Sequence, residues 1–250
     1  MVSTRHHPRE FPSPESATAK PLIKSPVKAP ATTTAGSSRK WVHTPSAAVT
    51  IWLSLSVPLV IWDAGYVLLR PHSMPGGRLH SPIWTPYALY GTVDYIYGWP
   101  AYNARNGFTA AQTVLNIVET LGYVYYLWVV YVHGSAVVGR GQSKISKGFR
   151  WLLTGDKVVA GRIGAIALLV AYTASIMTVS KTILYWLNEV FSGFENIGHN
   201  DAFTLIVMWI IPNGLWIVFP TYNIYVLGAE ILNSLELATP RGRPGRPKSS

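Results

Sequence analysis

Hydrophobic side chains fill four long stretches of the chain, and polar segments separate them. The stretches are Ala48–Leu69, Thr109–Val132, Ile163–Trp186 and Phe203–Leu227. Because an α-helix rises about 1.5 Å per residue, each stretch is long enough to cross about 30 Å of hydrocarbon. The pattern predicts an all-α, polytopic membrane protein whose four spans form a helix bundle over residues 47–232.

Both ends of the chain are polar and basic. Residues 1–46 hold seven prolines, many Ser, Thr and Ala residues, and seven Lys or Arg residues. Such a composition buries too little apolar area to offset the entropy of ordering, so we expect a disordered basic tail. Residues 233–250 form a second basic tail. The first tail contains no apolar stretch of the kind found in cleavable signal peptides, so we expect the first span to act as a signal anchor.

Basic residues alternate between the segments that connect the spans. Three Lys or Arg residues follow the first span, six follow the second, and none lies between the third and fourth. The positive-inside rule then predicts that both termini are cytoplasmic and that the first and third loops are lumenal. This bias accounts for most of the net charge of +10. We expect no nucleic-acid partner, and we interpret the AT-hook-like Pro240–Pro244 as a cytoplasmic anchor.

The first loop, Pro71–Gly107, is rich in Pro, Gly, Trp and Tyr residues. The amphipathic rings of Trp and Tyr favour the membrane interface. We expect this loop to cover the lumenal mouth of the bundle as a partly ordered aromatic lid. An interfacial aromatic belt without a role in binding explains the same composition.

Each span carries polar and aromatic residues along one helical face. In chain order they are Trp52, Ser56, Asp63 and Tyr66; Gln112, Asn116, Glu119 and Tyr123; Ser175, Thr182, Trp186 and Glu189; and Trp209, Asn213, Trp216, Pro220 and Asn223. With alternating helix directions, Asp63 lies about 9 Å below its lumenal helix end, and Glu119 and Asn213 lie about 15 Å below theirs. We therefore expect one cavity for a hydrophobic small molecule. Simple interhelical hydrogen bonding stays open for Gln112 and Asn116.

Asp63 and Glu119 are each the lone charged residue of their spans. An ionisable group at membrane depth costs about 2.5–3.5 kcal/mol on insertion scales and usually marks a functional site. A purely structural hydrogen-bonding role stays open for either acid. Lys181 lies on a different face from Ser175 and near the lumenal end of its span, so we expect its side chain to extend toward the interface.

The sequence predicts no metal site and no cofactor. The chain has no cysteine, which excludes disulfides, thiolate chemistry and cysteine-based zinc sites. His72, His80 and His133 lie in loops or at a span end, and their spacing indicates no metal site.

Four short motifs, in order along the chain, resemble segments of a known family. They are Ile61-Trp62-Asp63, Val118-Glu119-Thr120, Ile183-Leu-Tyr-Trp-Leu-Asn-Glu189 and Asn213-Gly-Leu-Trp-Ile-Val-Phe-Pro220. This ordered set resembles the emopamil-binding-protein family, also called the EXPERA-domain family, which includes the sterol Δ8–Δ7 isomerase and the sigma-2 receptor. The resemblance covers about residues 48–232.

The resemblance implies proton chemistry on an alkene. In the family's isomerase an acid protonates a double bond, a carbocation forms, and a base removes a different proton. By position, Asp63 and Glu119 would share the acid and base work, Trp216 would face the cation, and Asn213 would orient a carboxyl. Ligand contacts are expected from the following residues: Tyr66, Gln112, Asn116, Tyr123, Ser175, Tyr185, Glu189 and Trp209.

Two positions depart from the isomerase. Leu59 stands where the isomerase has a histidine four residues before its first acid, and Asp63 replaces a glutamate. The expected function is therefore a membrane isomerase, or a cation-type cyclase, that acts on a sterol- or terpenoid-like alkene. The alternative is a non-catalytic protein that binds or transports sterols or cationic amphiphiles. The expected location is the endoplasmic reticulum membrane, and a homodimer stays open.

Overall fold

The computed structural model of the chain describes residues 41–137, 148–153 and 157–239, which belong to one unit of the chain. Within these residues, four helices are long and apolar enough to cross a membrane. They are α1 (Ala47–Leu68), α4 (Phe108–His133), α6 (Gly161–Phe191) and a composite of α7 (Ala202–Leu205), the π-helical turn η1 (Ile206–Ile210) and α8 (Ile211–Ala238). The prediction of a helical, multi-pass membrane protein is confirmed at this level.

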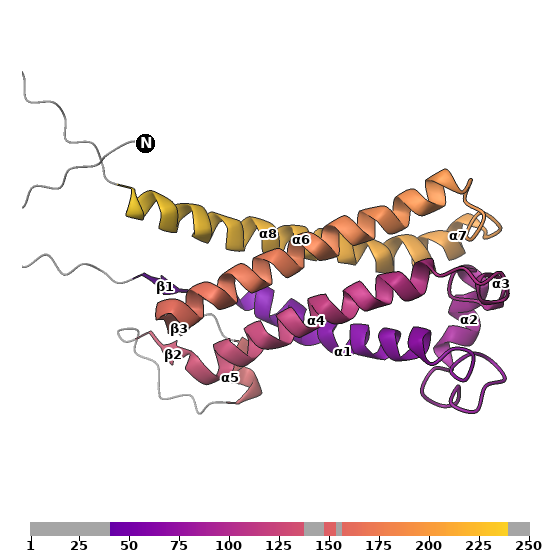
Figure 1. The fold of residues 1–250 in the computed structure, drawn as a ribbon, viewed down its shortest axis with the longest axis horizontal. Coiled ribbons are helices and arrows are strands. Elements are labelled where there is room, and N and C mark those ends of the chain that lie inside the picture. Colours follow the sequence, from indigo (N-terminus) through magenta and orange to yellow (C-terminus); the bar gives the residue numbers. More distant parts are fainter. Residues whose placement is uncertain (1–40, 138–147, 154–156, 240–250) are drawn as a thin grey trace, which may run out of the picture. The chain divides into compact units, whose positions relative to one another are not determined.

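The long helices pack side by side in the order α1, α4, α6 and α8 (Figure 1). Gly122 of α4 allows a close approach to α6, because a Cβ there would lie only 3.3 Å from Val170 Cγ1. The Trp52 ring of α1 stacks on Phe219 of α8, with ring centroids 4.3 Å apart. These contacts bring the four polar stripes toward a common interior.

Large apolar side chains cover the outward faces of the helices. Leu55, Leu121, Leu184 and Val218, one on each long helix, are all more than half exposed. So many exposed large apolar side chains are unusual for a protein in water, whereas lipid solvates them readily. The exposed surface therefore agrees with helices that lie in a bilayer.

A small antiparallel sheet lies at one end of the helices. Its strands are β1 (Val42–His43), β2 (Ser135–Ala136) and β3 (Lys157–Ala160), in the order β1-β3-β2. The short helix α5 (Phe149–Leu153) contacts α1 and α4 nearby. Strands of two to four residues carry no readable alternation, so the sequence pattern did not predict this sheet.

The folded part extends beyond the segment predicted for it at both ends. Strand β1 lies inside residues 1–46, which were expected to be disordered, and α8 runs into the predicted tail 233–250. Residues 1–40 and 240–250 lie outside the described residues. His43 explains the ordered strand, because its buried ring lies 2.9 Å from Glu230 Oε2 on α8 and 3.0 Å from Tyr126 Oη on α4.

At the other end of the helices, residues 69–107 connect α1 to α4. This connecting segment holds the helices α2 (Pro86–Val93) and α3 (Trp99–Asn103). Gly98 permits the tight packing of the segment, since a Cβ there would overlap the carbonyl of Gly91. The Tyr95 N–H donates to Asn196 O at 3.1 Å, and Asn200 Nδ2 donates to Val93 O at 2.7 Å. The connecting segment is thus fixed to the residues between α6 and α7 (Figure 1).

Candidate functional site

A cavity of about 440 Å³ lies between the long helices and the connecting segment 69–107. Ligand pockets in proteins usually measure about 300–1,000 Å³, so a polycyclic lipid is of a suitable size. Six of the residues predicted to act in catalysis or binding line this cavity: Asp63, Gln112, Asn116, Tyr185, Asn213 and Trp216. They come from all four spans, although Tyr185 of α6 lies outside the polar stripe predicted for that span.

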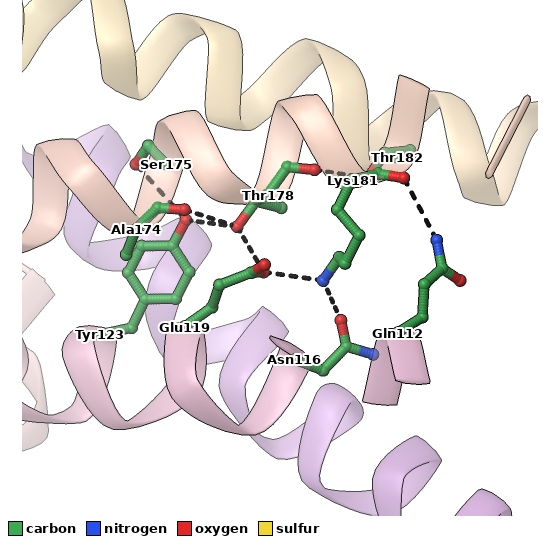
Figure 2. A network of polar contacts seen from close by, with 9 residues as sticks. All are labelled: Gln112, Asn116, Glu119, Tyr123, Ala174, Ser175, Thr178, Lys181 and Thr182. Atoms are coloured by element: carbon green, nitrogen blue, oxygen red, sulfur yellow. Dashed lines mark hydrogen bonds and ion pairs between the residues drawn. The ribbon is translucent and has the colours of Figure 1, made fainter. Parts of the chain in front are cut away.

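Glu119 does not line the main cavity; it forms an ion pair with Lys181 of α6. Lys181 Nζ lies 2.8 Å from Glu119 Oε2, and the two side chains are 8% and 5% exposed. The same carboxylate oxygen accepts a hydrogen bond from the Thr178 hydroxyl at 2.8 Å, and Lys181 also donates to Asn116 Oδ1 (Figure 2). Two hydrogen-bond donors, one of which carries the opposite charge, therefore compensate this buried carboxylate.

The expectation that Lys181 extends to the interface is wrong. Helix α6 continues to Phe191, so Lys181 lies ten residues, or about 15 Å, from the helix end, too far for its side chain to reach the end easily. Its face is also the interior one, since Thr178, Lys181 and Tyr185 follow the three-and-four spacing of a buried helical seam. The acceptors on α4 hold the ammonium inside.

Glu119 and Tyr123 line a second, much smaller void of about 20 Å³. That volume is close to the space one water molecule needs. The Tyr123 hydroxyl lies 2.9 Å from Thr178 Oγ1, which extends the network of the ion pair (Figure 2). Val60, Asn116 and Trp216 line both the void and the main cavity, so the two spaces are adjacent.

Asp63 lies on the wall of the main cavity and accepts a hydrogen bond from the Tyr87 hydroxyl. The Tyr87 ring stacks on Tyr66 with ring centroids 3.7 Å apart. Burial raises the pKa of the Tyr87 and Tyr97 hydroxyls well above the usual range, so both stay protonated and can donate. Sequence reasoning treated these rings only as part of a lid, and no spacing signal linked Tyr87 to Asp63.

Asp94, in the connecting segment 69–107, is a buried polar residue that the sequence pattern did not single out. It is fully buried, and its Oδ2 accepts hydrogen bonds from Trp209 Nε1 at 3.0 Å and from the Tyr185 hydroxyl. Its Oδ1 accepts from the Ile96 N–H at 3.1 Å. Burial raises the pKa of Asp94 to about 6. One carboxyl thus joins the connecting segment to α6 and η1.

Four of the predicted ligand contacts line neither the cavity nor the void. Tyr66 is buried behind Tyr87 and donates to Tyr97 O at 2.8 Å. Ser175 donates to Ala171 O on its own helix. Glu189 accepts from Asn196 Nδ2 at 2.8 Å near the end of α6, and Trp209 is bound to Asp94. These four side chains support the structure around the cavity.

The fourth span changes its hydrogen-bond pattern beside the cavity. Pro212 has no N–H to donate, and the π-helical turn η1 immediately precedes α8, where Pro212 is the second residue. Asn213 Nδ2 donates to Trp209 O at 2.8 Å across this turn. Turns of this type occur often at functional sites. The turn sets the positions from which Asn213 and Trp216 face the cavity.

The described residues contain no group of three or more His, Cys, Asp or Glu side chains arranged to hold a metal ion. Comparison with protein-family models, curated proteins and solved structures returned no match. The fold and the site together define a multi-pass membrane protein with an aromatic, acid-bearing cavity between its spans.

Proposed function

We propose that the protein binds a sterol- or terpenoid-like alkene in the cavity and moves its double bond, as an isomerase or a cation-type cyclase. The observation that carries the proposal is the cavity of about 440 Å³, which has aromatic walls and the carboxyl of Asp63 on its surface. The resemblance of the four motifs to the emopamil-binding-protein family supports the same chemistry.

Asp63 is the group proposed to move protons. Its carboxyl gives a proton to one alkene carbon, which leaves a carbocation on the neighbouring carbon and a carboxylate on Asp63. That carboxylate then removes a proton from a different carbon, so a new double bond forms and the carboxyl is restored. Tyr87 holds the carboxyl in place through its hydrogen bond. One carboxyl suffices for this cycle, which matters because Glu119 is paired with Lys181.

Trp216 is proposed to stabilise the carbocation. Its indole lines the cavity and meets the edge of Trp52 with ring centroids 5.4 Å apart, which restricts its orientation. A desolvated cation over an indole face gains about 2 kcal/mol. Asn213 lines the same cavity and lies three residues before Trp216 on α8.

Non-catalytic binding of a sterol is the second candidate, and the ion pair favours it. Lys181 neutralises Glu119, which removes one of the two carboxyls that the family resemblance assigns to catalysis. Expression in a yeast strain that lacks its sterol Δ8–Δ7 isomerase separates the two candidates. New Δ7 sterols that disappear with Asp63→Asn support the enzyme. Unchanged Δ8 sterols, with the protein present in the membrane, contradict a sterol isomerase.

The connecting segment 69–107 is proposed to be a lumenal lid, in a protein of the endoplasmic reticulum membrane with cytoplasmic termini. Six Lys or Arg residues between the second and third spans, against none between the third and fourth, support this orientation. The chain has no cysteine, so single-cysteine variants report topology cleanly.

Glu195→Cys and Ser135→Cys are suitable topology variants, because both positions are exposed at opposite ends of the helices. In sealed microsomes, an impermeant thiol reagent should label the cysteine at position 135 and leave the one at position 195 unlabelled. The reverse pattern would overturn the orientation.

A further inference from the structure

Lys181 places a full positive charge on the wall of the proposed ligand cavity. Its side chain lines that cavity, and its Nζ is bound to Glu119 Oε2 and Asn116 Oδ1. Lys181 and Glu119 form an electrically neutral pair, and both side chains are more than nine-tenths buried. The Lys181 ammonium therefore supplies the counter-charge that the buried Glu119 carboxylate needs.

The second carboxyl of the site shares the cavity wall with Lys181. Asp63 lines the same cavity and accepts the Tyr87 hydroxyl. A ligand with a permanent cationic group beside Lys181 would meet the ammonium in a water-poor space, where like charges repel strongly. The transient carbocation of the proposed reaction differs, because it forms beside the carboxylate that Asp63 leaves behind. An uncharged ligand meets no such repulsion.

Glu119 keeps unused acceptor capacity. Its Oε2 receives both Thr178 and Lys181, while its Oε1 is buried and has no hydrogen-bond partner among the described residues. If the ammonium were removed, this carboxylate would be an uncompensated buried charge, and it would gain more than before from a cation at the cavity wall.

We propose that Lys181 is the specificity-determining residue of the cavity: its ammonium occupies the cation position beside Glu119, so the protein accepts uncharged alkenols and rejects cationic amphiphiles. The inference rests on the proposed function only in taking this cavity as the lipid site. It predicts that Lys181→Met converts a protein selective for neutral ligands into one that binds amines.

The test uses the full chain in detergent micelles and three probes that differ at one position. The probes are a sterol with its 3-hydroxyl, the same sterol with a 3-dimethylamino group, and the same sterol with an uncharged 3-acetamido group. Tryptophan fluorescence reports binding, because Trp62 and Trp216 line the cavity. The wild type should bind the hydroxyl probe at least tenfold more tightly than the amine.

In Lys181→Met the affinity for the amine should rise at least tenfold, with little change for the acetamido probe, which controls for the altered volume. Lys181→Arg keeps the charge and should still reject the amine. Glu119→Gln in the Lys181→Met background should abolish the gain, whereas Asp63→Asn in that background should preserve it. A wild type that binds the amine as tightly as the sterol, or a Lys181→Met variant without the gain, overturns the inference.

A variant that fails to fold also gives a result. If Lys181→Met and Lys181→Gln aggregate, addition of the amine during extraction should recover monodisperse protein, and the hydroxyl probe should not. Equal recovery by both probes, or by neither, contradicts the inference. The yeast sterol profile is a separate readout. If no turnover is seen but Lys181→Met gains affinity for the amine, only the enzymatic activity is rejected. If turnover is seen without that gain in affinity, only the role of Lys181 is rejected.

Discussion

Asp63 and Glu119 look equivalent in the sequence, since each is a lone charged residue in an apolar span, yet the folded protein treats them differently. Glu119 is buried between α4 and α6 and bound to an ammonium and a hydroxyl. Asp63 is partly exposed on the cavity wall and bound to one tyrosine hydroxyl. One acid is held in a charged pair, and the other faces the space where a ligand would lie.

The difference arises from the residues that each acid meets on other helices. The partner of Glu119 is Lys181, a seam residue of α6, and the partner of Asp63 is Tyr87 of the connecting segment. A full opposite charge fixes Glu119 between the helices, whereas a single neutral hydroxyl holds Asp63 at the cavity wall. Under the proposed function, Glu119 is then a structural residue and Asp63 is the residue that moves protons.

Removal of one member of the ion pair should have the largest effect on stability. Glu119→Gln leaves the Lys181 ammonium buried without its counter-charge, and losses of about 3–5 kcal/mol are typical of such changes. Replacing both residues, as Glu119→Gln with Lys181→Met, should recover most of that loss. Unfolding in mixed detergent micelles measures the free energies. Equal stability of Glu119→Gln and the wild type would contradict the buried pair.

Asp94 should make stability depend on pH. An unfolded aspartate titrates near a pKa of about 4, and burial raises the pKa of Asp94 to about 6 in the folded protein. Between these pH values the folded state holds more protons than the unfolded state, so its stability falls as pH rises from about 4 to about 6. The fall should be on the order of 3 kcal/mol and should level off above pH of about 7.

Asp94→Asn should flatten that pH profile, because the amide does not titrate. Unfolding measured across this pH range in wild type and variant checks the prediction. Asp201→Asn is a control of opposite sign: hydrogen bonds from Thr204 lower the pKa of this exposed carboxyl, so its replacement should not flatten the fall. A profile that keeps its slope in Asp94→Asn would show that another group is responsible.

Asp63→Asn should lower turnover by about 100-fold or more, which corresponds to about 2.7 kcal/mol of transition-state stabilisation. The stability should change much less, since the amide oxygen still accepts the Tyr87 hydroxyl. Sterol profiles and unfolding of the same preparation separate the two effects. Full turnover by Asp63→Asn would mean that a different group moves the proton.

Tyr66→Phe should have the smallest effect. The Tyr66 hydroxyl donates to Tyr97 O, and its loss should cost about 1 kcal/mol of stability. Ligand affinity should stay within about twofold, because Tyr66 does not line the cavity. Tyr87→Phe is the informative partner, since it removes the hydrogen bond to Asp63 and should lower turnover as well. A large affinity loss in Tyr66→Phe would show that the ring contacts ligand directly.

The four spans could be predicted because long apolar stretches dominate the local signal. The convergence of Asp63, Asn116, Asn213 and Trp216 on one cavity also followed, since helical periodicity fixes which residues share a face. What could not be predicted depends on pairings between distant segments. Asp94 gains its partners only when the connecting segment packs on α6 and η1.

The wrong prediction for Lys181 arose from an incorrect end of the third span. Ending the third span at Trp186 made Lys181 look close to the interface, whereas α6 continues to Phe191. The spacing from Thr178 to Lys181 and Tyr185 did contain the signal of an interior face. A buried lysine becomes a reasonable prediction only when its acceptors, Glu119 and Asn116, are considered on the neighbouring helix at the same depth.

Carboxyl labelling tests the distinction between the two acids most directly. Dicyclohexylcarbodiimide partitions into membranes and adds to accessible, protonated carboxyls, and peptide mass spectrometry then identifies the modified residue. We expect modification of Asp63, protection of Asp63 by the hydroxyl sterol, and no modification of Glu119, which is buried in its ion pair with Lys181. Modification of Glu119 in the wild type, with Asp63 unlabelled, would contradict the assignment of proton transfer to Asp63.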